Sequence, residues 1–99
     1  MAISVFIKRV CKDSAKEKEL FNLVRKIRSL VPQQLGYLSS KYVKKIDHPK
    51  DIIAISTWES LIDWKNWYES KQRREIQSKI DAIPGVETTF QIYEDAKTE

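Results

Sequence analysis

The apolar residues of this 99-residue chain change their spacing from one segment to the next, and the order of spacings limits the folds available to it. Strands place every second side chain on one face, whereas helices place side chains three or four positions apart on one face. The spacings predict strand, helix, strand, strand, helix and strand. The corresponding segments are residues 3–10, 14–31, 37–46, 52–58, 61–83 and 86–94.

Polar residues mark the boundaries of these segments. Ser14 and Glu17 match the S-x-x-E capping box that begins a helix, and Pro32 marks the end of that helix. The sequence Asp-His-Pro-Lys-Asp at 47–51 is a dense turn signal, so residues 37–58 are expected to form a hairpin. No internal linker interrupts the chain, which is therefore expected to be a single domain, residues 1–99, with a polar tail at 95–99.

The second predicted helix is unusually aromatic. All three Trp residues fall within residues 57–68, and Ser60 is a favourable N-cap with Asp63 three positions later. One continuous helix is expected after Trp58. Its apolar face would carry Leu61, Trp64, Trp67 or Tyr68, Ile76, Ile80 and Ile83.

This order of elements predicts an α+β fold of the ferredoxin-like βαββαβ type, with one antiparallel sheet and both helices on one of its faces. The strands do not alternate cleanly between apolar and polar residues. Phe6 and Val10 share a strand with the apolar residues of the opposite face, and residues 52–55 read Ile-Ile-Ala-Ile. We therefore expect the second face to pack against a second copy, giving a homodimeric α/β barrel with a pocket between helices and sheet.

Composition argues against several functional classes. The net charge is +4, but Lys and Arg are interspersed with acidic and apolar residues, so no nucleic-acid partner is expected. No apolar run approaches the ~18 residues of a membrane span and no signal-peptide pattern is present, which predicts a cytoplasmic protein without membrane attachment. Cys11 is the single cysteine and has no His or Cys cluster nearby, so neither a disulfide nor a metal site is expected.

One stretch resembles a known family. Residues 55–70, Ile-Ser-Thr-Trp-Glu-Ser-Leu-Ile-Asp-Trp-Lys-Asn-Trp-Tyr-Glu-Ser, are similar to the strand-to-helix signature of the antibiotic biosynthesis monooxygenase (ABM) family. The order of elements also matches across nearly the whole chain. The resemblance implies a dimeric α/β barrel, and members with known activities oxidise small aromatic or polyketide-like substrates with molecular oxygen and without metal or flavin.

A related branch of that family degrades haem, using a Trp that Trp67 matches, an axial His and an Asn in the first strand. The axial His position falls on Gln77 and the Asn position on Ile7. Gln cannot replace imidazole as a strong iron ligand, so haem degradation is disfavoured. The single His, His48, has neighbours typical of an exposed turn, which favours a turn role over catalysis.

A cofactor-free oxygenase needs a surface for an aromatic ring, stabilisation of an anion and exclusion of water. Tyr37, Tyr42 or Tyr68 could hydrogen-bond a hydroxyl group, and Arg9, Lys41 or Arg73 could favour a phenolate. The expected substrate-binding residues are Trp67, Trp64, Trp58, Tyr37, Tyr68 and Arg73. No residue is assigned as catalytic and no cofactor is expected.

Two classes of function remain open at this stage. The first is a cofactor-independent monooxygenase of a small aromatic or quinol compound. The second is a dimeric module that binds a small hydrophobic molecule without turnover, because no acid, base or metal constellation stands out. For the Trp residues a place in the core or an interface is the more common role, and the fold alone does not choose between the two classes.

Overall fold

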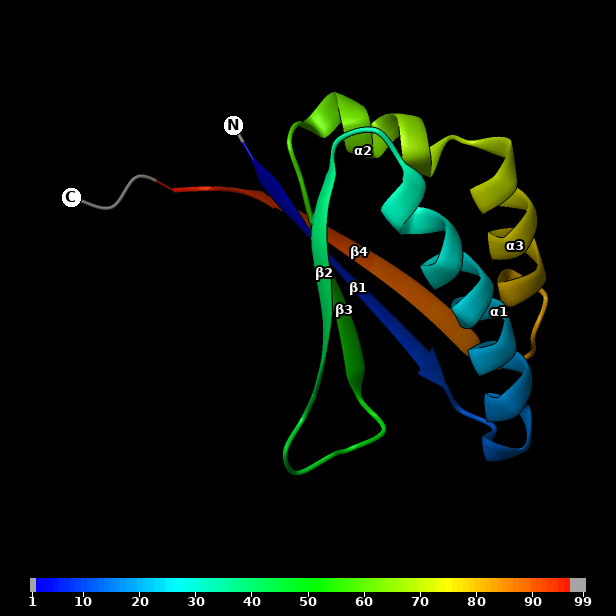
Figure 1. The fold of residues 1–99 in the computed structure, drawn as a ribbon. Coiled ribbons are helices and arrows are strands. Elements are labelled where there is room, and N and C mark those ends of the chain that lie inside the picture. Colours follow the sequence, from blue (N-terminus) through cyan, green and yellow to red (C-terminus); the bar gives the residue numbers. More distant parts are fainter. Residues whose placement is uncertain (1, 97–99) are drawn as a thin grey trace.

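A single four-stranded antiparallel sheet forms one layer of the protein, as a computed structural model describing residues 2–96 shows (Figure 1). The strands lie side by side in the order β2, β3, β1, β4. Their bounds are Ile3–Cys11 for β1, Tyr37–Lys44 for β2, Ile52–Trp58 for β3 and Val86–Glu94 for β4. This order, with β1 and β3 in the centre, confirms the predicted ferredoxin-like α+β fold.

The helices form a second layer on one face of the sheet (Figure 1). They are α1 (Glu17–Leu30), α2 (Leu61–Tyr68) and α3 (Lys71–Asp81), with short 3-10 segments η1 (Ser14–Lys16) and η2 (Val31–Gln33) at the two ends of α1. No helix among residues 2–96 is both long enough and apolar enough to cross a membrane. Residues 97–99 of the expected polar tail lie outside the described residues.

The prediction of one continuous helix over 61–83 is wrong, because the helix is broken after Tyr68. Ser70 has extended backbone angles (φ −62°, ψ 145°), and its hydroxyl accepts a hydrogen bond from the backbone N–H of Arg73. Ser70 therefore caps a new helix, α3. The sequence pattern did not reveal this break, because the helical spacing of apolar residues continues from Trp64 to Ile76 and Ile80.

The capping box predicted for the first helix is also wrong. Asp13, one residue earlier, accepts a hydrogen bond from the backbone N–H of Ala15 at 3.0 Å. Ser14 begins the 3-10 segment η1, and no side chain caps α1 itself. For the second helix the predicted cap is confirmed, because the Ser60 hydroxyl accepts the backbone N–H of Asp63 at 3.2 Å.

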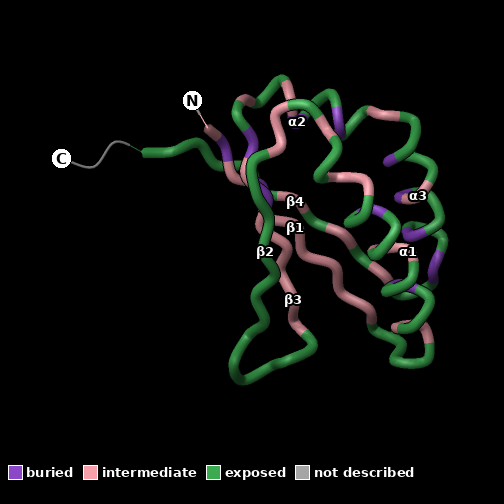
Figure 2. The backbone as a smooth tube through the Cα atoms, viewed as in Figure 1, coloured by how far each residue is buried: buried purple, intermediate pink, exposed green. Residues whose placement is uncertain are grey.

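The core lies between the sheet and the inner sides of α1, α2 and α3, each of which contributes buried positions (Figure 2). Val5, Trp58 and Ile80 are completely shielded from solvent, and Trp64 and Trp67 are about as deeply buried. The indole N–H of Trp58 donates to the Ser56 hydroxyl at 3.0 Å. This bond satisfies a polar group that water cannot reach, so a tryptophan can occupy the centre of the core.

Gly36 allows the chain to turn into β2 directly beside α2. Its φ is +84°, and a Cβ there would overlap the side chain of Asp63. Its carbonyl oxygen accepts the backbone N–H of Glu59 at 2.8 Å, which joins this turn to the end of β3. Glycine is therefore required here by both the backbone angle and the close approach.

The face of the sheet opposite the helices is uncovered in the single chain and is partly apolar. Phe6 lies opposite Ile55 in the β1–β3 pairing, so their side chains share this face. The Phe6 and Tyr93 rings meet edge to face with centroids 5.2 Å apart. Tyr93 and Val43 remain 52% and 40% exposed, so this face retains apolar surface that residues 2–96 do not cover.

Candidate functional site

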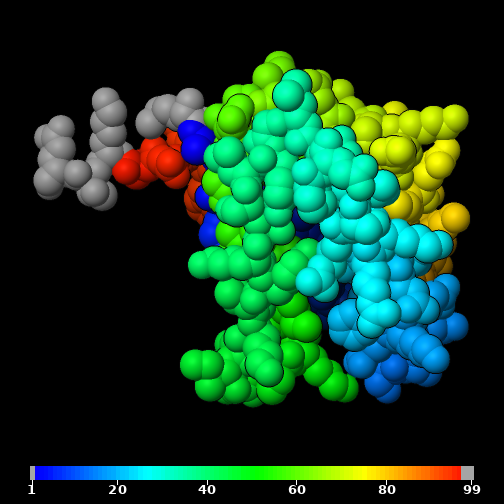
Figure 3. All heavy atoms as spheres, viewed as in Figure 1, coloured from blue at the N-terminus to red at the C-terminus, as the bar shows by residue number. Residues whose placement is uncertain are grey.

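A cavity of about 320 Å³ lies between α1 and the sheet. Figure 3 shows the hollow between α1 and the β2–β3 hairpin, with atoms of β1 at its floor. The backbone of α1 runs mainly alongside α3 and the adjacent η1 and η2 segments, whereas α2 approaches β3 and α3 approaches β4. Because α1 stands away from the strands, side chains of moderate size leave a space beneath it.

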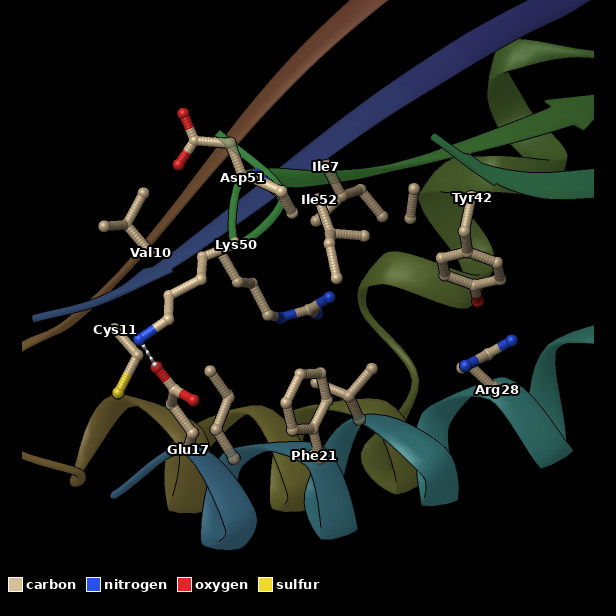
Figure 4. Close-up of a pocket in the computed structure, with 15 residues that line it drawn as sticks. Ile7, Val10, Cys11, Glu17, Phe21, Arg28, Tyr42, Lys50, Asp51 and Ile52 are labelled. Atoms are coloured by element: carbon tan, nitrogen blue, oxygen red, sulfur yellow. Dashed lines mark ion pairs between the residues drawn. The ribbon is translucent and has the colours of Figure 1, made fainter. Parts of the chain in front are cut away.

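Most of the cavity wall is apolar, and strand register explains how it is assembled. Ile7 of β1 lies opposite Ala54 of β3, so both side chains point to the helix face. Phe21 projects from α1 toward Ile52 across the cavity (Figure 4). The apolar lining comprises Ile7, Val10, Leu20, Phe21, Val24, Ile52 and Ala54, together with Pro49 and Cys11.

One end of the cavity is formed by a stacked pair of side chains. The Arg28 guanidinium carbon lies 3.8 Å from the centroid of the Tyr42 ring, and both are labelled together in Figure 4. Burial raises the pKa of Tyr42 above its usual 10.0, although the positive charges of Arg28 and Arg9 act in the opposite direction. The Tyr42 hydroxyl is therefore neutral at physiological pH and can both donate and accept a hydrogen bond.

Arg9 contributes a second guanidinium to the wall, from the helix face of the central strand β1. Its Nη2 donates to Oε1 of Gln77 on α3 at 3.0 Å. Its Nε is shielded from solvent and has no hydrogen-bond acceptor among the described residues. Burial, with the positive charge of Arg73 second, lowers the pKa of Arg9 to about 10, so the group remains charged at neutral pH.

The opposite end of the cavity is closed by the hairpin loop. Lys50 Nζ lies 3.4 Å from Oε1 of Glu17, which links the loop to the first turn of α1 (Figure 4). Asp51 faces Lys8 with a separation of 3.9 Å. His48 belongs to the turn, where its backbone N–H donates to the carbonyl of Lys45, and it does not line the cavity.

None of the six predicted binding residues lines this cavity. Trp58, Trp64 and Trp67 are part of the core, and Tyr37 packs edge to face on Trp58 with centroids 5.7 Å apart. Whether these four contact a ligand stays a prediction. Of the polar candidates considered beside them, Arg9 and Tyr42 line the cavity.

Tyr68 and Arg73 lie together in a second hollow, between α3 and β4. The Arg73 guanidinium carbon is 4.1 Å from the centroid of the Tyr68 ring, and Nη1 donates to the carbonyl of Tyr68 at 2.9 Å. Only 6% of Arg73 is exposed, although an exposed surface role is the usual one for such a residue. The burial lowers the pKa of Arg73, and the contacts fasten α3 to the end of α2.

Sequence reasoning missed several residues of the main cavity, notably Glu17, Phe21, Arg28 and Lys50. Phe21 and Arg28 lie on the part of α1 outside its core stripe, since Leu20 and Ile27 are the buried residues of that helix. In the sequence, Phe21 is a large apolar residue beside that stripe, and this is a signal that could have indicated a second lined surface; in the structure 49% of it is accessible.

Among the residues that the structure describes, no group of three or more His, Cys, Asp or Glu side chains comes together in a way that could hold a metal ion. Gln77, at the position that would need a His for haem, has its amide bonded to Arg9, Asp81 and Thr88. These contacts hold Gln77 in a structural role between α3 and the sheet.

The chain has the ferredoxin-like α+β fold of the antibiotic biosynthesis monooxygenase proteins, which confirms the predicted resemblance at the level of the fold. A conserved protein from Methanosarcina mazei Go1 is similar over 97% of this chain and 94% of its own, with a TM-score of 0.84 and 19% identity. SnoaB from Streptomyces nogalater, a cofactor-independent oxygenase, is similar over 98% of this chain and 95% of its own, with a TM-score of 0.80 and 8% identity.

An antibiotic biosynthesis monooxygenase with 12% identity gives a TM-score of 0.80 over 96% of this chain and 99% of its own. No family profile and no curated protein matches the sequence. Similarity at these identities establishes the fold, so the activity has to be argued from the site.

Proposed function

We propose that the cavity beneath α1 binds a small aromatic compound and that the protein is a cofactor-independent monooxygenase. The observation that carries this proposal is the cavity itself, about 320 Å³ of mostly apolar space with two guanidinium groups and a phenol in its wall. Binding sites for small molecules commonly combine an apolar lining with a few converging polar groups. The similarity in fold to SnoaB, a cofactor-independent oxygenase, supports the same class of reaction.

The proposed reaction converts a phenol and O₂ into a quinone and water. One oxygen atom is added to the ring carbon para to the hydroxyl, and the other leaves as water with the two hydrogens that the substrate loses. The reactive species is the electron-rich phenolate, so a site that stabilises this anion lowers the barrier. Arg9 and Arg28 would stabilise the anion, the Tyr42 hydroxyl would orient it, and the apolar wall would exclude water.

Oxygen consumption by the intact protein tests the proposal. Phenols and naphthols of increasing size, each with an unsubstituted ring carbon para to the hydroxyl, are supplied in air-saturated buffer, and products formed under ¹⁸O₂ are examined by mass spectrometry. We expect one labelled oxygen atom in a quinone product, with a lower rate for Arg28→Gln and Tyr42→Phe. Rates equal to buffer across the panel, or a product without label, would reject the monooxygenase.

A specific observation favours the alternative, a binding module without turnover. The two carboxylates in the cavity wall, Glu17 and Asp51, each lie within ion-pair distance of a lysine. Neither is placed as a free general base for removing the phenol proton. Saturable quenching of tryptophan fluorescence by the same phenols, without oxygen uptake, would identify this second function.

We also propose that the uncovered sheet face packs against the same face of a second copy. The support is the apolar character of that face, where Phe6, Ile55 and Tyr93 lie together with exposed Val43. Isologous contact between two such faces would bury this surface in a closed two-fold dimer. A homodimer would also add core to a chain whose size limits the surface it can bury alone.

Light scattering at micromolar concentration tests the homodimer. Val43→Lys should convert a dimer to a monomer, because it places a charge in the proposed interface. Ile62→Lys is the matched control, since Ile62 is 66% exposed on α2, away from this face, and should remain a dimer. A monomeric wild-type protein would contradict the proposal.

A further inference from the structure

We propose that the ligand of the cavity carries a permanent negative charge, in the form of a carboxylate attached to its aromatic ring, and that Arg9 is the residue that binds this carboxylate. The inference rests on the proposed function for the location of the site, but it does not require that the ligand be oxidised. It names a chemical class, the small aromatic carboxylates, and the residue that selects it.

The charges of the wall do not balance. Five charged side chains line the cavity: Arg9, Arg28, Lys50, Glu17 and Asp51. Lys50 is paired with Glu17, and Asp51 faces Lys8 from outside the wall. Within residues 2–96, no carboxylate lies within ion-pair distance of Arg9 or Arg28. The wall therefore carries one more positive than negative charge, and neither of its two guanidinium groups has an ion-pair partner among the described residues.

Of the two guanidinium groups, that of Arg9 is the more buried and has the greater need of a countercharge. Arg28 is largely exposed, whereas Arg9 lies on the inner face of a central strand. Among the described residues, the Arg9 guanidinium has one acceptor, the neutral Gln77 amide, and its shielded Nε has none. The Asp81 carboxylate is separated from Arg9 by that amide, because Gln77 Nε2 donates to Asp81 Oδ1 at 2.9 Å. Burying a guanidinium with incomplete pairing is unfavourable, so a countercharge in the cavity would stabilise it.

The shape and charge of the Arg9 guanidinium indicate which chemical group in a ligand would pair with it. A guanidinium presents its N–H donors in a plane that matches a carboxylate, and such charge-assisted pairs are stronger than bonds between neutral groups. A simple phenol is a weaker candidate because its pKa, near 10, leaves it mostly neutral at pH 7. A carboxylate is ionised throughout the physiological range. The apolar lining around Ile7, Phe21 and Ile52 would hold the attached ring.

A matched set of three ligands tests this inference by calorimetry on the intact protein at neutral pH. The probes are 3-hydroxybenzoate, 3-hydroxybenzamide and phenol, which share a phenol with an unsubstituted para carbon and differ in the group meta to the hydroxyl. We expect the benzoate to bind at least about tenfold more tightly than the amide, a ratio equivalent to about 1.4 kcal/mol. This comparison uses the wild-type protein, so it does not depend on a variant that folds.

Variants of Arg9 are then compared with a control variant that loses one positive charge outside the cavity. Arg9→Gln should remove the preference for the benzoate, and Arg9→Lys should retain only part of it because the planar donor pair is lost. Arg25→Gln removes one positive charge from the exposed side of α1, outside the cavity, and should leave the preference unchanged. Circular dichroism confirms that each variant is folded. A preference that survives in folded Arg9→Gln assigns the charge to another residue and overturns the inference.

Oxygen uptake with the same three probes separates this inference from the proposed function. Oxidation of phenol with insertion of labelled oxygen, combined with equal binding of benzoate and amide, would overturn the inference and leave the oxygenase. Tighter binding of the benzoate without any oxygen uptake would support the inference and reject the oxygenase. Failure of all three probes to bind would overturn the assignment of an aromatic carboxylate to this cavity.

Discussion

Replacing Ala54 by leucine should change stability and ligand binding in opposite directions. Ala54 lies in the middle of β3, and its side chain points into the cavity between Ile7 of β1 and Tyr42 of β2, the residues opposite it in the sheet. The substitution adds three carbon atoms at the floor of an existing space. It therefore tests directly whether the space is available and whether ligands use it.

The sign of the stability change follows from the size of the cavity. Three additional carbons gain at most about 2.4 kcal/mol if they are fully buried, at about 0.8 kcal/mol for each one. In a filled core the same change would instead cost about 1–3 kcal/mol through overpacking. The space is about 320 Å³ but is not closed, since Phe21 in its wall is 49% exposed. We therefore expect a net gain of about 1 kcal/mol, or a rise of about 4–8 °C in Tm.

Thermal unfolding followed by circular dichroism, at fixed protein concentration, measures the change in stability. Fluorescence titration with a phenol that binds the wild-type protein measures the change in ligand affinity, and we expect at least about a tenfold loss. Ala82→Leu is the matched control, because Ala82 is exposed at the end of α3 and does not line the cavity. A clear loss of stability in Ala54→Leu, or unchanged affinity, would refute the reasoning.

Three further substitutions test individual contacts. Ser56→Ala removes the acceptor of the buried Trp58 N–H and should cost about 1–3 kcal/mol in urea unfolding, so a change under about 0.5 kcal/mol would contradict that bond. Gly36→Ala forces φ +84° on alanine and places its Cβ on Asp63, so the free energy of unfolding should fall by more than about 1 kcal/mol. Tyr42→Phe should remove the highest-pH step of the tyrosinate absorbance titration, because burial raises the pKa of Tyr42 above 10.0. In the wild-type protein, Tyr42 loses its hydroxyl proton at a lower pH in the unfolded chain than in the folded chain. The contribution of Tyr42 to the free energy of unfolding should therefore decrease as pH rises above 10.0 and become constant above the pKa of the folded protein. A titration curve with the same highest step in Tyr42→Phe would assign that step to another tyrosine.

The fold could be predicted from the sequence because each element carries its own periodic signal. The last two strands were predicted with the bounds that the structure shows, Ile52–Trp58 and Val86–Glu94. The break at Ser70 was missed because apolar periodicity continues across it, while the signal for the break is a single capping hydroxyl. The capping side chain was misplaced by one residue, since Asp13 and Ser14 are both favourable cap types and sequence alone does not rank them; Asp13 caps the 3-10 segment η1 that precedes α1.

The cavity was harder to predict because it depends on distances between layers. Alternation in β1 places Ile7 and Arg9 on the helix face, but it contains no information on how far α1 stands from that face. The prediction therefore assigned the pocket to the residues with the largest aromatic rings. Large rings fill space well, and Trp58, Trp64 and Trp67 are buried where packing is tight. The space remained where the facing residues are smaller, around Ala54 and Val24.

The tryptophan-rich segment still influences the cavity through the position of α3. Trp64 and Trp67 anchor α2 in the core, and the bond from Arg73 to the Tyr68 carbonyl fixes the first turn of α3 to the end of α2. One turn later, α3 presents Gln77, whose amide holds Arg9 in the cavity wall. The aromatic residues thus determine where the helix stands, and the helix determines where the buried charge lies. Without that bond the Arg9 guanidinium would have no fixed direction, so the proposed anion site depends on how the aromatic core positions α3.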